Sequence, residues 1–190
     1  MDFDSVISFW FGAPDSVERG RPRACWFKKD AQFDQEIRTR FLALHETAAR
    51  GELAAWERTP LAALALIVTL DQFPRNIFRG EARAFATDAL ALAVARRAVD
   101  QGFDALLGTQ ERTFVYLPFE HAEDLAAQRR SLALFGALAG QPDTAGNIDY
   151  ARRHYEIIAR FGRFPHRNAI LGRACTSEEE TFLLQPGSSF

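Results

Sequence analysis

Cysteine is scarce in this chain of 190 residues, which contains two, Cys25 and Cys175. They lie far apart, and neither belongs to a CxxC pair or has a histidine at metal-ligand spacing. A disulfide framework and a zinc knuckle are therefore not indicated. The low cysteine content fits a reduced compartment, and we expect a cytoplasmic protein.

Long hydrophobic runs and a basic amino terminus are also lacking. The longest uncharged stretches have about twelve residues, fewer than the ~20 that a membrane-spanning helix needs. Met1 to Asp4 is acidic where a secretory signal peptide would be basic. We expect a soluble protein without a membrane partner, folded as a single domain over residues 1–190, because a chain of this length buries roughly 70% of its unfolded surface.

Lysine is nearly absent, since Lys28 and Lys29 are the only lysines among 23 basic residues and the others are arginines. Genomic base composition is the simplest cause. Arginine nevertheless suits carboxylates and phosphates better than lysine does, so its clusters are informative. The net charge of −2 gives no general attraction to phosphate backbones, and we expect no nucleic-acid partner.

No alternating β-branched run between hairpin turns occurs, so strands are not predicted. The apolar periodicity instead predicts an all-α domain of roughly eight helices joined by short loops. His45, in the second of these helices, is expected at the surface or its boundary. The expected helices span about residues 4–11, 30–50, 60–74, 87–101, 109–117, 118–140, 148–161 and 176–185, and residues 186–190 are expected to form a flexible tail.

The stretch 60–80 is the one around which the chain is organised. Leu61 to Leu70 has no charge and is apolar on every face of a helix, which predicts a buried central helix. Pro74 is expected to stop this helix. A buried carboxylate needs an arginine or backbone donors, so we expect Asp71 to be paired. The polar residues that arrive together at the helix end are Asp71, Gln72, Arg75, Asn76 and Arg79.

A second polar group falls in PFEHAED, residues 118–124, which we expect at a helix start. Acidic residues in a first turn complement the helix dipole without any further function, but that reason does not apply to His121. The residues concerned are Glu120, His121, Glu123 and Asp124.

Residues 72–77 are echoed by residues 163–170. Both segments combine Phe-Pro with arginine and asparagine after an apolar helix; Phe-Pro as a helix terminator is the simpler explanation of the echo. The alternative is that residues 71–79, 120–124 and 163–168 meet at one site with His154 close by. The echo contributes Arg163, His166, Arg167 and Asn168 to that site.

Several long, uncommon motifs, spread over almost the whole chain, resemble the uncharacterised bacterial family called domain of unknown function nine-twenty-four. The resemblance implies an α-α superhelix with a tetratricopeptide-like fold, and it supplies no catalytic mechanism. Ala122 departs from the EHSED form of one motif, so no hydroxyl acts there. The motifs are FWFG (9–12), WFKKD (26–30), LDQFPRNIFRG with AFATD (70–88), YLPFEHAED (116–124) and ARFGRFPHRNAILGR with TSEEE (159–180).

Three functions and one structural explanation fit these residues. The first function is a pocket for a small anionic or zwitterionic molecule, held by the arginines and asparagines. The second is an enzyme without cofactor or metal in which His121 transfers protons, oriented by Glu120, Asp124 or another carboxylate, with His154 or His166 as a second group. The third is a helical scaffold that binds a protein or peptide. Alternatively, the arginines and carboxylates only join helix ends.

The sequence contains no nucleophile elbow, phosphate-binding glycine loop or dinucleotide fingerprint. The acidic residues and histidines also lack HExxH or paired ExxH spacing, so a metal site is disfavoured. The oligomeric state stays open.

Overall fold

The computed structural model describes residues 2–189, and within this range the fold is all-α, without strands, as the sequence predicts. The described helices, apart from short 3₁₀ turns and a π turn, are α1 (Phe3–Phe11), α2 (Ala31–Ala49), α3 (Pro60–Ile67), α4 (Phe73–Ile77), α5 (Asp88–Asp100), α6 (Thr109–His121), α7 (Leu125–Gly136), α8 (Ala145–Phe161) and α9 (Ser177–Leu183).

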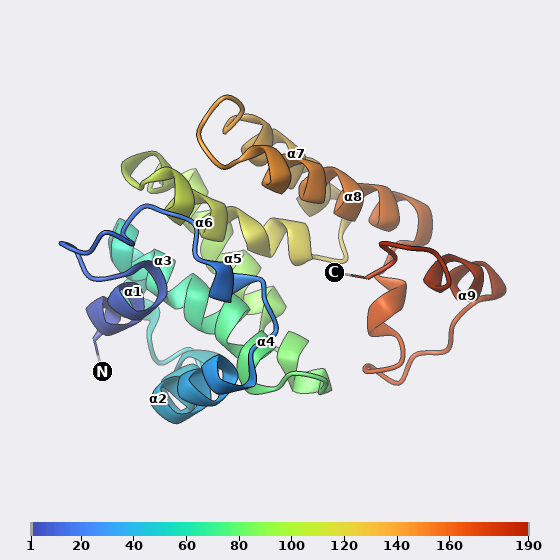
Figure 1. Ribbon diagram of the computed structural model, residues 1–190, viewed down its shortest axis with the longest axis horizontal. Helices are drawn as coiled ribbons and strands as arrows, with labels where there is room; N and C mark the ends of the chain where they lie inside the picture. The colour runs from blue at the N-terminus through green and yellow to red at the C-terminus, as the bar shows by residue number, and fades with distance from the viewer. Residues whose placement is uncertain (1, 190) are drawn as a thin grey trace.

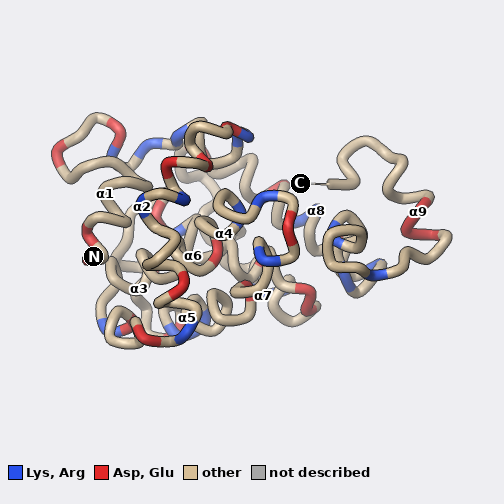
Figure 2. The backbone as a smooth tube through the Cα atoms, turned by 90° about the horizontal axis from the view of Figure 1, so that it is seen from below, with Lys and Arg blue, Asp and Glu red and all other residues tan. Residues whose placement is uncertain are grey.

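Helix α3 lies in the middle of the fold, and α1, α5 and α6 pack around it (Figure 1). Helix α2 packs on α4, while α7 and α8 form a pair that adjoins α6. Figure 1 shows α9 set to one side, beyond the end of α8. Figure 2 shows acidic and basic positions mixed over the outer elements, with none on α3. The tetratricopeptide-like superhelix that the family resemblance implies stays a prediction.

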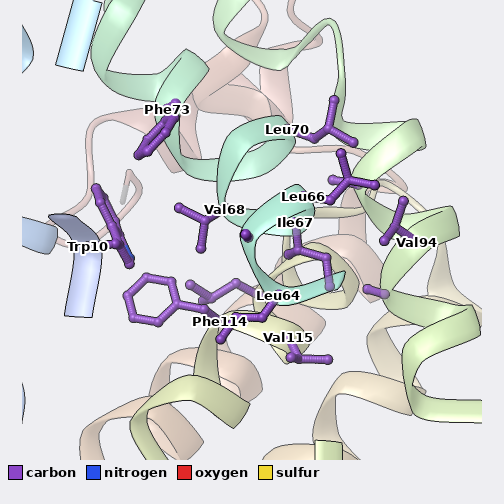
Figure 3. Close-up of a cluster of buried hydrophobic side chains, with 14 of the residues drawn as sticks. Trp10, Leu64, Leu66, Ile67, Val68, Leu70, Phe73, Val94, Phe114 and Val115 are labelled. Carbon is purple, nitrogen blue, oxygen red and sulfur yellow. The ribbon is translucent and has the colours of Figure 1, made fainter. Parts of the chain in front are cut away.

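The central helix is buried because its side chains are apolar on all sides. Residues 62–70 are all buried, and Leu61, at 37% exposure, is the single exposed position of the predicted stretch. Figure 3 shows Leu64 and Val68 on the side of the central helix that faces Trp10 and Phe114 from neighbouring helices. Together these side chains form one continuous core, to which α1, α5 and α6 all contribute.

Pro74 does not stop the central helix, contrary to the sequence-based expectation. The chain passes from α3 through a π turn, η3 (Val68–Gln72), into α4, with Pro74 in the first turn of α4. The wider turn shifts the hydrogen bonding, so that the Phe73 N–H donates to the Val68 carbonyl five residues earlier. A π turn tolerates the proline because the ring then avoids the carbonyl it would otherwise strike.

The carbonyl groups released by this irregular turn accept hydrogen bonds from side chains instead. Thr87 Oγ1 donates to the Leu70 carbonyl at 2.6 Å, and Arg75 donates to the Asp71 carbonyl at 2.6 Å. His45 Nδ1 lies 2.9 Å from the Thr69 carbonyl. His45 is thus a buried partner of the backbone, not the surface or boundary residue we expected.

Pro118 also lies inside a helix, because α6 continues past it to His121. The acidic group expected at one helix start is therefore divided between two elements. Glu120 and His121 occupy the last turn of α6, and Asp124 is the N-cap of α7, where its side chain accepts the Ala127 N–H. This division directs Glu120 and His121 toward the interior and leaves Asp124 at the surface.

Residues 186–189 of the segment expected to be a flexible tail lie against preceding elements. Ser188 is buried, and its hydroxyl donates to the Leu183 carbonyl at 3.1 Å. The Gly187 carbonyl accepts from Arg153 on α8 at 3.2 Å. Phe190 falls outside the described residues. None of the described helices is long and apolar enough to cross a membrane.

Replacing Thr87 by valine should destabilise the protein by about 1–3 kcal/mol, because the buried Leu70 carbonyl loses its donor. Urea unfolding would measure the loss. Thr39→Val is the matched control, since that threonine is exposed on α2 and its hydroxyl bonds the Gln35 carbonyl of its own helix. Equal destabilisation by the two substitutions would contradict the role given to Thr87.

Candidate functional site

A cavity of about 770 Å³ lies where α4, α6, α8 and the 3₁₀ turn η6 (Pro165–Arg167) approach one another. The segment at residues 26–28, in the loop before α2, closes another side. The lining comprises Trp26, Phe27, Lys28, Gln72, Arg75, Asn76, Arg79, Gly80, Ala84, Phe85, Leu117, Glu120, His121, Phe135, Asn147, Tyr150, Arg153, His154, His166, Arg167, Ile170 and Ser189.

Asp71 lies beneath the cavity and is fully buried. Its carboxylate accepts Gln72 Nε2 at 2.6 Å, and Arg75 Nη2 lies 3.6 Å away. Burial alone would raise the pKa of Asp71, but the positive charge of Arg75 and the hydrogen bonds from His121 and Gln72 outweigh it and hold the pKa well below its usual range. Asp71 is therefore an ionised, paired carboxylate, as expected.

His121 links this carboxylate to the cavity. Its Nδ1 lies 2.8 and 3.0 Å from the two oxygens of Asp71. Burial and the nearby charge of Arg75 lower the pKa of His121, although Asp71 acts in the opposite direction. At neutral pH the ring is thus neutral and donates its Nδ1 proton to Asp71. The other nitrogen, Nε2, is left as an acceptor for the cavity that His121 lines.

Two arginines, one from each copy of the Phe-Pro echo, meet at Asp88. Arg75 binds Asp88 through both terminal nitrogens, at 2.9 and 3.1 Å, and Arg167 binds it through one, at 3.2 Å. The Arg167 guanidinium also lies between two aromatic rings, 4.6 Å from the centre of Phe85 and 4.5 Å from that of Phe164. The echo therefore places two guanidinium groups side by side at the cavity wall.

Glu120 lies next to His121 in sequence, also lines the cavity, and is 4% exposed. Burial, helped by the negative charge of Asp71, raises the pKa of Glu120 to about 8. Burial also lowers the pKa of His154 to about 3. Both groups are therefore neutral at pH 7, and their contact of 3.4 Å is not an ion pair. His154 Nδ1 lies 2.9 Å from the Tyr150 carbonyl and donates to it.

Three further candidates also line the cavity. Burial and the charge of Arg167 lower the pKa of His166 to about 4. Asn76 and Arg79 both bind Asp34 of α2, at 2.7 Å from the amide and at 2.6 and 2.7 Å from the guanidinium. These two residues thus join α4 to α2 and present only part of their surface to the cavity.

The remaining candidates have structural partners away from the cavity. Arg163 makes a two-pronged pair with Glu179 at 2.6 and 2.7 Å. Asn168 accepts from Arg173 at 2.9 Å, and Asp124 caps α7. Arg163 and Asn168 hold the carboxy-terminal segment together, and none of these three residues lines the cavity.

The three predicted segments do meet. Besides the contact between Asp71 and His121, Glu123 Oε1 accepts the Phe164 N–H at 2.8 Å. Asp88 and Asp34, the carboxylates that bind arginines of the cavity, were not singled out from the sequence. Asp88 follows the N-cap of α5 and Asp34 lies in the first turn of α2, where an acidic residue is expected without any further partner. The sequence feature that could have indicated them is the pair of arginines within residues 75–79, because these need carboxylates from other segments as partners.

The comparisons with known proteins place the chain in a family and give it no activity. Residues 6–187 match the family described as bacterial protein of unknown function, DUF924. A solved structure, the protein of unknown function ATU0120 from Agrobacterium tumefaciens, is similar at 43% identity and a TM-score of 0.84, over 96% of each chain. No functionally curated protein matches. The chain therefore belongs to the bacterial DUF924 family, as its motifs indicate.

Proposed function

We propose that the protein binds a small anionic or zwitterionic organic molecule in the cavity. Its volume of about 770 Å³ falls within the range of roughly 300–1,000 Å³ that is typical of sites for small molecules. Apolar and aromatic residues surround a few polar groups there, as such sites usually require. The neighbouring helix ends supply those polar groups.

The charge of the lining carries this proposal. Among the described lining residues, five are cationic and one, Glu120, has a carboxyl group, which is protonated at neutral pH because burial raises its pKa to about 8. Asp88 and Asp34, which pair with the arginines, are not lining residues. A ligand therefore meets arginine donors in a partly desolvated space, while the carboxylates that balance Arg75, Arg79 and Arg167 lie behind the cavity wall. The cationic lining residues are Lys28, Arg75, Arg79, Arg153 and Arg167.

Arg167 is the cation best placed to hold an anion. Arg167 is 6% exposed, and no described residue accepts a hydrogen bond from its Nε. Burial and the like charge of Arg75 lower its pKa to about 10. Asp88 bridges the two guanidinium groups, and a carboxylate or phosphate in the cavity would accept hydrogen bonds that they do not give to Asp88.

A peptide-binding scaffold is the alternative suggested by the fold. It would require a long open groove along several helices, whereas the polar groups here converge from helix ends on one cavity. The small molecule is therefore the better-supported ligand.

Arg167→Gln should remove ligand-induced stabilisation. A small carboxylate or phosphate at about 100 times its dissociation constant stabilises a fold by roughly 2.7 kcal/mol, which a melting curve resolves. We expect a panel of small carboxylates and phosphorylated metabolites to contain compounds that raise the melting temperature of the natural protein but not that of Arg167→Gln.

Arg160→Gln is the matched control, because this arginine is exposed on α8 and pairs with Glu178 outside the cavity. It should respond to the same compounds as the natural protein does. Anions that stabilise the natural protein and both variants equally bind outside the cavity, and this result would contradict the proposal. The absence of any stabilising compound would contradict it as well.

Glu120→Gln should make the protein more resistant to rising pH. Between the ordinary pKa of 4.5 and about 8, an unfolded chain releases the Glu120 proton while the folded protein retains it, so this group causes stability to fall as the pH rises. The natural protein and the variant should therefore unfold at similar urea concentrations near pH 5. At pH 8 the variant should be the more stable of the two.

The difference should grow by at most about 1.4 kcal/mol per pH unit. The four histidines have lowered pKa values and act in the opposite direction, but they are present in both proteins and cancel in the comparison. A difference in unfolding free energy that stays constant from pH 5 to pH 8 would show that Glu120 is not held protonated.

A further inference from the structure

Asp71 holds the His121 ring in the orientation that a general base requires. Asp71 is fully buried, and Gln72 Nε2 and Arg75 Nη2 hold its carboxylate from two other directions, at 2.6 and 3.6 Å. With Nδ1 committed to Asp71 at 2.8 Å, the ring has one tautomer, in which Nε2 carries a lone pair. No described residue donates a hydrogen bond to Nε2. A purely structural histidine would not need this nitrogen at a cavity.

A protonated acid lies beside this base. Glu120 precedes His121 in the last turn of α6, and both line the cavity. Its Oε2 atom is buried and has no hydrogen-bond partner among the described residues. A buried carboxyl oxygen without a partner is costly in a structural role, and a molecule in the cavity would supply that partner. One helix end thus offers a proton acceptor and a proton donor to the same space.

The rest of the cavity restricts what the ligand can be. Arg75 and Arg167 fit a carboxylate at one wall, where they share Asp88. Trp26, Phe27 and Phe135 line other parts of it and provide aromatic surface. The matching ligand is an organic acid whose body is aromatic or apolar.

We propose that the cavity catalyses proton transfer on an enolisable 2-oxo carboxylate with an aromatic side chain, with His121 Nε2 as the base and Glu120 as the acid. The inference rests on the proposed anion binding and names its substrate class and reaction. A neutral imidazole is a weak base, so it requires a C–H bond acidified by an adjacent carbonyl group. A 2-oxo acid whose third carbon is a CH₂ group has such a bond next to its carbonyl.

The step balances without a cofactor. The C–H bond breaks and its proton moves to His121 Nε2, while its electron pair forms the C=C bond of the enol. The carbonyl π electrons take the proton of Glu120, forming the enol O–H. Asp71 stabilises the imidazolium, and Arg75 and Arg167 hold the carboxylate in place. Proton exchange with solvent then restores neutral His121 and protonated Glu120, and no group is oxidised or reduced.

Phenylpyruvate tests both the chemistry and the binding. Deuterium incorporation at its methylene carbon, followed by NMR in D₂O, should be faster with the natural protein than in buffer alone. General acid–base groups typically contribute about 10²–10⁴-fold, so His121→Gln and Glu120→Gln should each lower the protein-dependent rate at least ~100-fold. Glu111→Gln should retain it, because that residue lies outside the cavity.

Asp71 acts through His121 and is a positioning residue. Asp71→Asn removes the negative charge beside the ring, so the pH profile of exchange should shift along with the rate. Circular dichroism melts would establish that each variant is folded. If His121→Gln or Asp71→Asn does not fold, Glu120→Gln still tests the proton transfer. Glu120 is already protonated and uncharged, so the amide of glutamine matches it in both shape and charge.

Benzoylformate separates the failure of this inference from that of anion binding. It is an aromatic 2-oxo acid without an enolisable C–H, and it should raise the melting temperature as phenylpyruvate does. Stabilisation by both compounds without accelerated exchange would overturn the proton-transfer proposal and leave anion binding intact. Stabilisation by neither compound would overturn the aromatic substrate class, and anion binding as well if the wider panel also fails. Exchange that survives in His121→Gln would overturn the role of His121.

Discussion

A carboxylate buried at the end of the core helix is the constraint on which the arrangement of the site depends. Asp71 is fully buried, and an ionised group there is stable only if charged and hydrogen-bonding partners surround it. Those partners come from separate parts of the chain: Gln72 and Arg75 from the following turn, and His121 from the end of α6. Satisfying one charge therefore brings two polar segments together. It also aligns the histidine ring at the cavity.

The irregular backbone around Asp71 serves the same end. A regular α-helix would be interrupted by Pro74, and the π turn allows the chain to continue into α4, which presents Arg75 at the cavity. The carbonyls released by the π turn accept hydrogen bonds from Thr87 and Arg75, and the Thr69 carbonyl lies 2.9 Å from His45 Nδ1. Thr87 directly precedes Asp88, the carboxylate that both arginines share. The residue that binds the released Leu70 carbonyl and the residue that binds both arginines are thus adjacent in sequence. π turns of this kind are frequent at functional sites.

Features encoded locally could be predicted from the sequence, and features that depend on tertiary partners could not. The buried core helix follows from Leu61 to Leu70 because its apolar character is visible within one segment. The meeting of the Phe-Pro echoes followed from their shared composition. The continuation of the chain through Pro74 could not be predicted, since it depends on hydrogen-bond donors such as Thr87 and His45 that other elements supply. The continuation of α6 past Pro118 was not predicted either. For the same reason Arg163 and Asn168 look like site residues in the sequence, while Glu179 and Arg173 engage them elsewhere.

The most direct test of the account is the tautomer of His121, measured by long-range ¹H–¹⁵N NMR of the imidazole nitrogens at pH 7. We predict a neutral ring with the proton on Nδ1 and a basic, unprotonated Nε2 whose resonance shifts when an organic anion enters the cavity. An imidazolium signal, or a proton on Nε2, would contradict it. Either result would mean that Asp71 does not hold the histidine as a base facing the cavity.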